Sequence, residues 1–334
     1  MRNFFRHFFV LSLLIGIGFG TSLRAAELKD GEILVNGHIV RSLQEAFDEV
    51  APGGIIRIGP GVFRQAGILK KKNGVHISGT ADTVFDGVAA GNKAAFVIAS
   101  NDVTIEDIGC RNISVRDRNG ACVRLEGTNL TLKNVTFTDS ENGLLSGRNS
   151  GKILIEDSVF ERNGRAGRSH SVYVGSGELT ILRSKFLSSK DQGHEIKSRA
   201  SRLVIKNCII ASLEGDDSRL IDISDGGIAI IQNNLLVEGA NTVNWQLFSF
   251  GVERSKYSTN MLRLEKNVIV TDREGGSEMV LVGKGMPAPI VRNNIIVGKF
   301  IKHDWSDENI IYKNRAELKW PEAPALPDWD PRKK

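Results

Sequence analysis

Residues 153–160 read Ile153-Leu154-Ile155-Glu156-Asp157-Ser158-Val159-Phe160, and this stretch decides the fold. Its pattern is apolar-x-apolar-x-(Asn or Asp)-x-x-apolar. Alternating apolar residues such as Ile153 and Ile155 are typical of a strand with one buried face, and Asp157 is a residue that favours a turn. The stretch therefore predicts a short strand, a turn and the start of a second strand.

The same pattern recurs along most of the chain. Copies begin at residues 103, 130, 153, 179, 203, 228, 262 and 289, at intervals of 27, 23, 26, 24, 25, 34 and 27 residues. A nearly constant period indicates a repeat architecture in which each unit packs on the next. No segment with helical periodicity separates the copies, so successive strands must stack directly. The repeats predict an all-β fold, a parallel β-helix of about ten turns.

The residues before the first strand predict a helix that covers the open end of this coil. Ser42 is a suitable N-cap with Glu45 in the capping-box position, and residues 43–50 carry an apolar face. Pro52-Gly53-Gly54 then stops the helix before a strand at residues 55–58. Over roughly residues 30–312, this arrangement resembles the right-handed parallel β-helix proteins of the pectate-lyase-like superfamily. The resemblance implies a right-handed coil, but that fold hosts lyases, hydrolases, epimerases and adhesins.

The two ends of the chain differ from the repeats. Residues 1–26 combine Arg2 and Arg6 with an apolar stretch and the pair Ala25-Ala26, which predicts a signal peptide, with an uncleaved anchor as the alternative. We expect a β-helix domain at residues 27–312 and an irregular, proline-rich tail at 313–334. The mature protein is then expected to be periplasmic or secreted, without stable membrane insertion.

The three cysteines do not indicate a disulfide framework. Cys110 occupies an apolar position of its repeat, which favours a small buried residue, with a Cys110 to Cys122 bridge as the alternative. No metal-binding spacing is present, so neither a cofactor nor a metal ligand is expected. Calcium is the alternative, because turn acids could form a cluster. These acids are Glu214, Asp216, Asp217, Asp222 and Asp225.

Counting back six residues from a repeat start gives a column of polar side chains on neighbouring strands. The column comprises Arg124, Tyr173, Lys197 and Asp222. Their sequence neighbours are apolar and are expected to point inward, so the column should point outward with a spacing of roughly 4.8 Å between strands. Gly147 is expected at this position in the turn of residue 153, where the absence of a side chain could leave room for a ligand.

Further polar residues are predicted to lie near this column. His170 and His194 are 24 residues apart and should stack, with Arg219 next, but their direction relative to the column is open. Arg199 should point the same way as Lys197. The turn lengthened to 34 residues adds Ser249 and Glu253, and residues 254–260 are expected to form one wall. Arg168, with Arg165, could form another.

These residue types suit β-elimination in a uronic-acid polymer. One group must neutralise the carboxylate, a second must remove the neighbouring proton, and a third must protonate the leaving oxygen. Arg199 or Arg219 could neutralise, Lys197 or a histidine could be the base, and Tyr173 the acid. We therefore predict two sets of residues. The catalytic set is Tyr173, Lys197, His194, His170 and Arg199, and the substrate-binding set is Arg124, Arg168, Arg219, Asp222, Ser249 and Glu253.

Three other activities compete with the lyase. A C5-epimerase would use the same proton abstraction, but the Asp-Pro-His-Glu signature of alginate epimerases is here Gln192-Gly193-His194-Glu195. A polygalacturonase-like hydrolase needs paired carboxylates, and its motifs occur in this chain in reversed order, the first being absent. A non-catalytic glycan-binding protein could use the same basic face. In the plainest alternative, Lys197 and Asp222 are only an exposed ion pair worth less than about 1 kcal/mol.

The net charge narrows the class of binding partner. The chain carries a formal charge of +5 and a pI near 9.1, which suits an acidic ligand. The export signal argues against nucleic acid. An acidic polysaccharide is therefore the predicted substrate.

Overall fold

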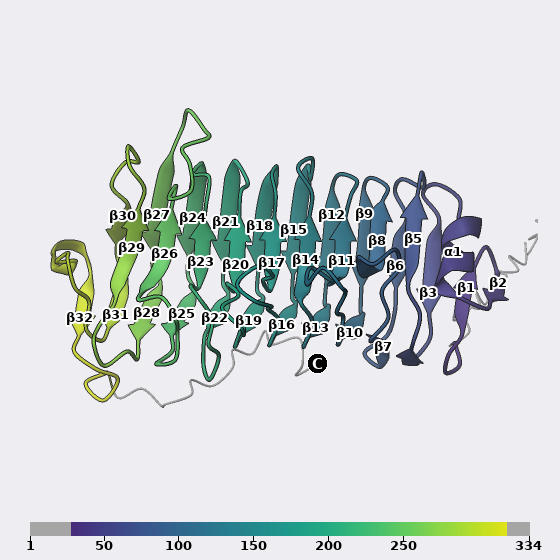
Figure 1. The fold of residues 1–334 in the computed structure, drawn as a ribbon, viewed down its shortest axis with the longest axis horizontal. Coiled ribbons are helices and arrows are strands. Elements are labelled where there is room, and N and C mark those ends of the chain that lie inside the picture. Colours follow the sequence, from purple (N-terminus) through teal and green to yellow (C-terminus); the bar gives the residue numbers. More distant parts are fainter. Residues whose placement is uncertain (1–27, 319–334) are drawn as a thin grey trace, which may run out of the picture.

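A computed structural model describes residues 28–318, which form one long coil of short strands (Figure 1). Three sheets run along the coil, and each turn of the chain contributes one strand to each sheet in succession. The smallest sheet has nine strands, which corresponds to about nine turns, slightly fewer than the ten expected. The all-β parallel β-helix predicted from the repeats is confirmed.

The three sheets are A, B and C, and the strands of each follow in spatial order. Sheet A contains β2 (His38–Val40), β1 (Ile33–Val35), β3 (Ile55–Ile58), β6 (His76–Ser78), β9 (Val103–Glu106), β12 (Leu130–Lys133), β15 (Lys152–Glu156), β18 (Glu178–Leu182), β21 (Arg202–Lys206), β24 (Ile228–Gln232), β27 (Met261–Glu265) and β30 (Ile290–Arg292). Sheet B contains β32 (Ile310–Tyr312), β31 (Ile295–Val297), β28 (Val268–Thr271), β25 (Leu235–Glu238), β22 (Ile209–Ala211), β19 (Lys185–Leu187), β16 (Val159–Glu161), β13 (Thr136–Thr138), β10 (Gly109–Arg111), β7 (Thr83–Asp86) and β4 (Gly61–Phe63). Sheet C contains β29 (Glu278–Val282), β26 (Gln246–Phe250), β23 (Ile221–Ile223), β20 (Ile196–Ser198), β17 (Val172–Val174), β14 (Asn142–Ser146), β11 (Ala121–Leu125), β8 (Ala94–Ala99) and β5 (Gly67–Lys70). Pairing is parallel except where β1 meets β2 and β3.

The repeated pattern spans the corner between sheets A and B. In residues 153–160, Ile153 and Ile155 point into the coil from β15, and Phe160 does so from β16. Asp157, between the two strands, has a left-handed backbone with a φ of 50°. Asn and Asp tolerate this conformation better than most residues, which explains the polar position of the pattern. The inward apolar residues of successive turns stack into one continuous core.

One repeat start was predicted one residue too early. Leu203 pairs with Ala229, not Ile228, and the residue with positive φ in that turn is Asn233. Residues 228–231 are apolar on both faces of the strand, so alternation alone could not fix their register. Ala229 is the residue that is buried in the core.

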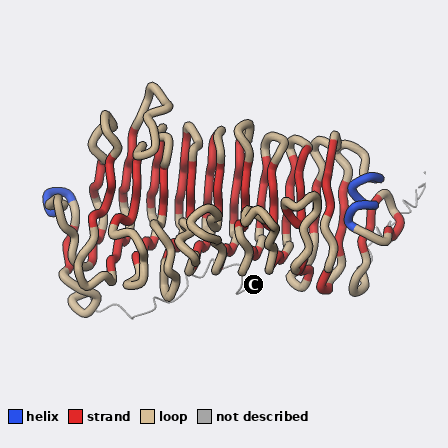
Figure 2. Tube along the Cα trace, in the orientation of Figure 1, coloured by secondary structure: helices blue, strands red, loops and turns tan. Residues whose placement is uncertain are grey.

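The predicted end cap is present. Helix α1 (Leu43–Glu49) begins after Ser42, whose side chain accepts a hydrogen bond from the backbone N–H of Glu45. Glu45 in turn accepts from the backbone N–H of Arg41 at 2.7 Å, which completes the capping box. Leu43, Ala46 and Phe47 are buried against the first turns, and the helix lies at the N-terminal end of the coil (Figure 2).

The chain ends fall largely outside this description. The predicted signal peptide, residues 1–26, lies outside the described residues, as does the tail after residue 318. Helix α1 and the 3-10 helix η1 (Ser306–Glu308) are both far shorter than a membrane span, and residues 28–318 contain no other helix.

Candidate functional site

The outward-facing column lies on sheet C in the predicted register. Parallel pairing places Tyr173 on β17 beside Lys197 on β20, and Lys197 beside Asp222 on β23. Ser249 on β26 continues the column after Asp222. The sequence separations of 24 and 25 residues therefore become contacts between adjacent strands.

The column differs from prediction at β14, where Leu145 and not Gly147 lies between Arg124 and Tyr173. The turn that follows Leu145 is two residues longer than the turn after Tyr173, so counting back six residues from the next repeat misses it. Gly147 still lines a hollow next to the column, as does Gly175 on the next turn. A Cβ atom on Gly175 would collide with the carbonyl oxygen of Gly147.

Asp222 is the centre of a buried polar network. Its carboxylate accepts hydrogen bonds from Lys197 Nζ at 2.6 Å, from Ser224 Oγ at 3.0 Å and from Ser249 Oγ, and His194 Nε2 lies 3.4 Å away. Burial opposes ionisation, but His194, Lys197 and these hydrogen bonds outweigh it, so the pKa of Asp222 is held well below its usual range. Asp222 is therefore an anion that holds four side chains together.

Lys197 is a largely buried cation. Besides Asp222, it donates to Glu253 Oε1 at 2.7 Å, and its side chain is 12% exposed. The pair with Asp222 is thus not the exposed ion pair of the plainest alternative. Burial lowers the pKa of Lys197, but the two carboxylates more than offset this, and the pKa lies above its ordinary value. Lys197 is then a charged donor between two carboxylates, whereas a lysine must be neutral to act as a general base.

The two histidines stack as predicted and are both buried. Their ring centroids are 4.8 Å apart at 14°, and His170 Nδ1 accepts a hydrogen bond from the backbone N–H of His194 at 3.0 Å. Burial is the main cause that lowers the pKa of His170 well below 6.5 and the pKa of His194 to about 4. A neutral His170 that accepts at Nδ1 carries its proton on Nε2. Both rings belong to the network around Asp222.

Arg199 connects this network to the solvent side of the column. Its guanidinium donates to Tyr173 Oη at 2.8 Å, to Asp225 Oδ1 at 2.5 Å and to Glu253. Asp225 is completely buried and also accepts from Arg254 Nε at 2.9 Å. Burial opposes the charge on Arg199, but the bonds to Glu253 and Tyr173 outweigh it and raise its pKa. The arrangement fixes the Tyr173 hydroxyl in place.

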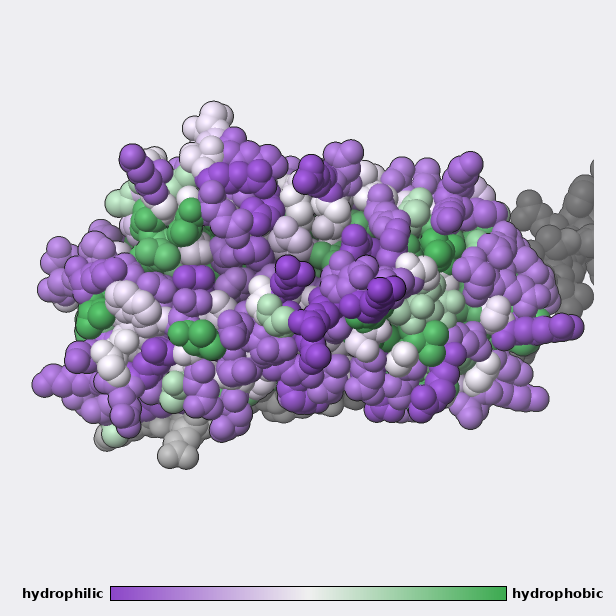
Figure 3. All heavy atoms as spheres, in the orientation of Figure 1, coloured by the Kyte–Doolittle hydropathy of each residue, from purple (hydrophilic) through white to green (hydrophobic). Residues whose placement is uncertain are grey.

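A cleft of about 590 Å³ lies beside Tyr173 and Arg199. Seven of its lining side chains are cationic and one is acidic. The lining residues are Asp117, Arg118, Asn119, Arg124, Leu145, Ser146, Gly147, Arg148, Arg168, Tyr173, Gly175, Arg199, Arg254 and Lys256. On this face the most hydrophilic side chains gather over the middle of the coil, where β11, β14 and β17 lie (Figure 3). The cleft is suited to an anionic ligand.

The cleft divides the predicted site residues into two groups. Tyr173, Arg124, Arg168 and Arg199 line it. The others are absent from its lining, and these are His170, His194, Lys197, Arg219, Asp222, Ser249 and Glu253. Arg219 donates to Gln246 at 3.3 Å, and burial lowers its pKa.

Both predicted walls are present, but other lining residues escaped prediction. Arg254 and Lys256 come from the lengthened turn, and Arg168 comes from the loop before β17. Arg118 and Arg148 were missed because they lie in loops between the repeats, where no periodic pattern places them. Within residues 28–318, neither of the two makes an ion pair.

No metal site is evident among the described residues, where no three His, Cys, Asp or Glu side chains gather as a metal would require. Three of the five acids considered for calcium bind other groups instead. Asp217 accepts from Ser212, Asp222 from Lys197 and Asp225 from Arg199.

Residues 62–210 match the family model described as "Right handed beta helix region". The described residues fold as a right-handed parallel β-helix, in agreement with this match. The resemblance seen in the sequence is thus confirmed at the level of the fold. No curated protein sequence matches the chain.

Two solved structures are similar to this chain in their backbone arrangement. One is a mutant pectin methylesterase in complex with a hexasaccharide, 12% identical, covering 88% of this chain and 95% of its own, with a TM-score of 0.46. The other is PfbA, a surface adhesin of Streptococcus pneumoniae, 12% identical, covering 77% and 83%, with a TM-score of 0.44. Neither likeness extends to an activity.

The β-helix contains a disulfide between Cys110 and Cys122, whose Cα atoms are 5.8 Å apart. Cys110 is buried as expected, but it is not free, and the alternative of a bridge to Cys122 is confirmed because the coil brings β10 and the start of β11 together. The third cysteine, Cys208, is free and buried. The bridge closes the loop of residues 111–121, which carries Arg118 to the cleft.

Proposed function

We propose that the protein binds an acidic polysaccharide in the cation-lined cleft and cleaves it by β-elimination. The observation that carries this proposal is the Tyr173–Arg199 pair at the edge of a cleft lined by seven cations and one acid. Such a lining attracts a polymer with a carboxylate on each sugar and disfavours a cationic one.

The cleft residues supply two of the three tasks of the reaction. Arg124, Arg148 and Arg168 neutralise a uronate carboxylate, which lowers the cost of the enolate-like intermediate. Tyr173 accepts its hydrogen bond from Arg199, so its own O–H remains available to donate to the leaving oxygen. As the C5 proton passes to solvent water in the open cleft, its electron pair forms the C4=C5 double bond and the C4–O bond breaks. The leaving oxygen takes the proton from Tyr173, which solvent then restores.

Hydrolysis fits the cleft less well. An inverting or retaining hydrolase of the usual type needs two carboxylates that flank the scissile bond. Asp117 is the only acid in the cleft lining as described. The hydrolase is therefore not proposed.

Glycan binding without turnover is the second candidate. It is favoured because the predicted bases already bind other groups of the protein. Lys197 is paired with two carboxylates, and His170 accepts a backbone hydrogen bond. In that case Tyr173 and the arginines would only hold the polymer.

We also propose that the protein acts outside the cytoplasm. Disulfides persist mainly in oxidising compartments, and the Cys110–Cys122 bridge supports that location together with the predicted signal peptide.

The test incubates the full chain with alginate, polygalacturonate and other uronic-acid polymers. A lyase generates unsaturated ends that absorb in the ultraviolet. Changed NMR signals of the uronate residues without unsaturation would identify an epimerase, and new reducing ends without unsaturation a hydrolase. Retention of a polymer with none of these products would leave the binding protein. If no uronate polymer binds or reacts, the proposal is wrong.

A further inference from the structure

A second hollow adjoins the cleft. Its volume is about 480 Å³, and Arg118 lines both. The lining residues are Asn112, Ile113, Ser114, Val115, Arg116, Arg118, Asp139, Ser140, Glu141, Gly164, Arg165 and Lys190. Residues 111–121, which we call the tongue, thus separate two hollows and present a cation to each.

The two acids of the second hollow are already engaged by the protein. Asp139 receives two hydrogen bonds from Arg162, both 2.9 Å long. Glu141 is buried and accepts from the backbone N–H groups of Gly120 at 2.7 Å and Val115 at 3.1 Å. Asp139 is therefore paired with a cation of the fold, and the Glu141 carboxylate is occupied by backbone donors of the tongue.

The four cations of this hollow are much less engaged. Arg116 and Arg118 make no ion pair within residues 28–318 and are exposed. Arg165 lies 3.9 Å from Asp191, and Lys190 lies 4.0 Å from Asp139, which are weak contacts at the surface. The hollow therefore has cationic side chains available for an external anion.

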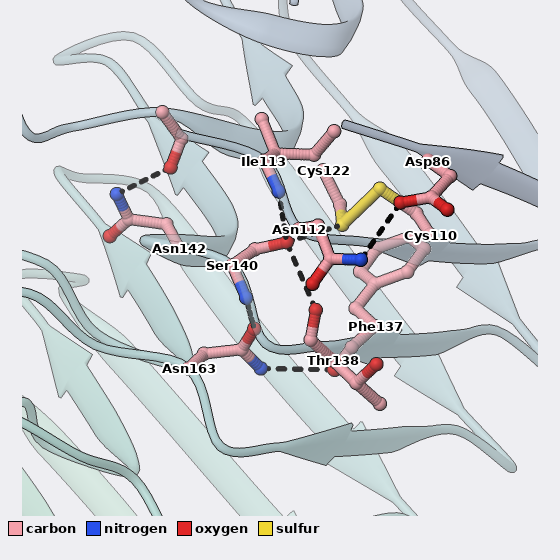
Figure 4. The surroundings of a disulfide bond; sticks show 11 residues. Asp86, Cys110, Asn112, Ile113, Cys122, Phe137, Thr138, Ser140, Asn142 and Asn163 are labelled. Carbon is pink, nitrogen blue, oxygen red and sulfur yellow. Dashed lines mark hydrogen bonds between the residues drawn. A yellow bond between two sulfur atoms is a disulfide. The ribbon is translucent and has the colours of Figure 1, made fainter. Parts of the chain in front are cut away.

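The tongue is held firmly at its base. The Cys110–Cys122 disulfide closes it, and Ile113 N–H donates to Ser140 Oγ at 3.0 Å (Figure 4). Asn142 Nδ2 donates to the carbonyl of Gly120 at 3.1 Å. A ligand that contacts Arg118 would therefore meet a preorganised loop and lose little affinity to ordering it.

A further anchor lies near the tip of the tongue. Ser169 Oγ donates to the carbonyl of Arg118 at 2.7 Å, which ties the tongue to the loop that carries Arg165 and Arg168. One of these arginines faces the second hollow and the other lines the cleft. The cationic surface is therefore continuous across the tongue.

We propose that the second hollow is an additional subsite for the same anionic polysaccharide, which crosses the tongue at Arg118. The class of ligand rests on the proposed function. A chain long enough to occupy both hollows gains the second set of contacts within one molecule, so affinity rises with chain length.

The test measures the affinity of size-fractionated oligouronates from alginate and polygalacturonate by calorimetry. For the unaltered protein, long oligomers should bind about tenfold or more tightly than short ones that fill only the cleft. The double substitution Arg116→Ala with Arg165→Ala should remove this gain and leave short oligomers at their original affinity. Arg148→Ala, in the cleft alone, should weaken short and long oligomers alike, and Lys133→Ala on sheet A should change neither.

Two results would overturn the subsite. One is an affinity that does not rise with length, and the other is a double variant that weakens every length equally. If no oligouronate binds, the same series is run with fragments of dextran sulfate, an anionic polysaccharide without uronate. Length-dependent binding of dextran sulfate that the double variant loses would uphold the subsite and contradict the uronate proposal. Absence of binding to either polyanion would contradict both.

Discussion

Tyr173 and Lys197 are neighbours on sheet C, yet they belong to regions with different properties. Tyr173 lines the open, cationic cleft, where cations far outnumber acids. Lys197 belongs to the buried network around Asp222, where it lies between two carboxylates. Strand register determines which side chains are neighbours. Whether they meet a ligand depends on the loops and glycines around them.

The largest loss of stability is expected when the buried network loses the carboxylate of Asp222. Asp222→Ala removes the carboxylate that Lys197 and His194 share and leaves buried charge unpaired, which should cost about 3–5 kcal/mol of the free energy of unfolding. Denaturant titration measures this cost. Glu253→Gln is the matched control, because Glu253 contacts the same Lys197 but its side chain is 44% exposed, and it should cost less than about 1 kcal/mol. Equal small costs would mean that the network is not structural.

A second prediction uses the neutral, buried state of His194. Its pKa of about 4 lies below the ordinary 6.5, so the unfolded chain binds the proton more tightly and stability is lost as pH falls from about 6.5 to about 4. At about 1.4 kcal/mol per pKa unit, the full loss is slightly more than about 3 kcal/mol. His194→Gln should remove this part of the pH dependence, measured by unfolding at several pH values. The exposed His303→Gln should keep it, and an unchanged slope in His194→Gln would contradict the prediction.

The third prediction concerns the cleft side of the comparison. Tyr173→Phe removes the hydroxyl held by Arg199 and should reduce the formation of unsaturated ends by about 100-fold or more. The free energy of unfolding should change by less than about 1 kcal/mol, since the side chain is only half-buried at the cleft. Tyr257→Phe is the control, because Tyr257 also bonds to Arg199, through the backbone carbonyl, but does not line the cleft. Equal losses in both variants would remove the special role of Tyr173.

The smallest expected effect comes from one exposed cation of the cleft. Arg148→Ala should weaken polyuronate binding about tenfold, equivalent to about 1.4 kcal/mol, without a change in stability. Added salt should reduce the difference between variant and unaltered protein because exposed charges are screened. Calorimetry at two ionic strengths measures both quantities. A salt-independent loss would indicate that Arg148 acts by packing.

Much of the fold was predictable because each repeat carries its own evidence. Residues such as Ile153, Asp157 and Phe160 mark a strand, a left-handed corner and the next strand, and eight copies reinforce one another. The error at Ile228 arose where both strand faces are apolar. The disulfide remained only an alternative because it depends on how two strands meet.

The site was predictable only where its residues occupy equivalent positions of successive repeats. The neighbours Tyr173, Lys197 and Asp222 came from register alone. The burial of these side chains could not be predicted from register, because it depends on side chains from several turns. The cationic Lys197 and the neutral histidines were therefore not anticipated. Arg118 and Arg148 lie in loops of irregular length, where counting from a repeat start has no meaning.

The central claim is that an acidic polysaccharide lies in the cleft and not on the buried network. A crystal structure of the Tyr173→Phe variant with an oligouronate tests it most directly. We predict that uronate carboxylates lie within hydrogen-bonding distance of Arg148 and Arg168, next to position 173. Lys197 should still be paired with Asp222. An oligouronate bound elsewhere, for example along the outer face of sheet A, with the cleft free of sugar, would contradict it.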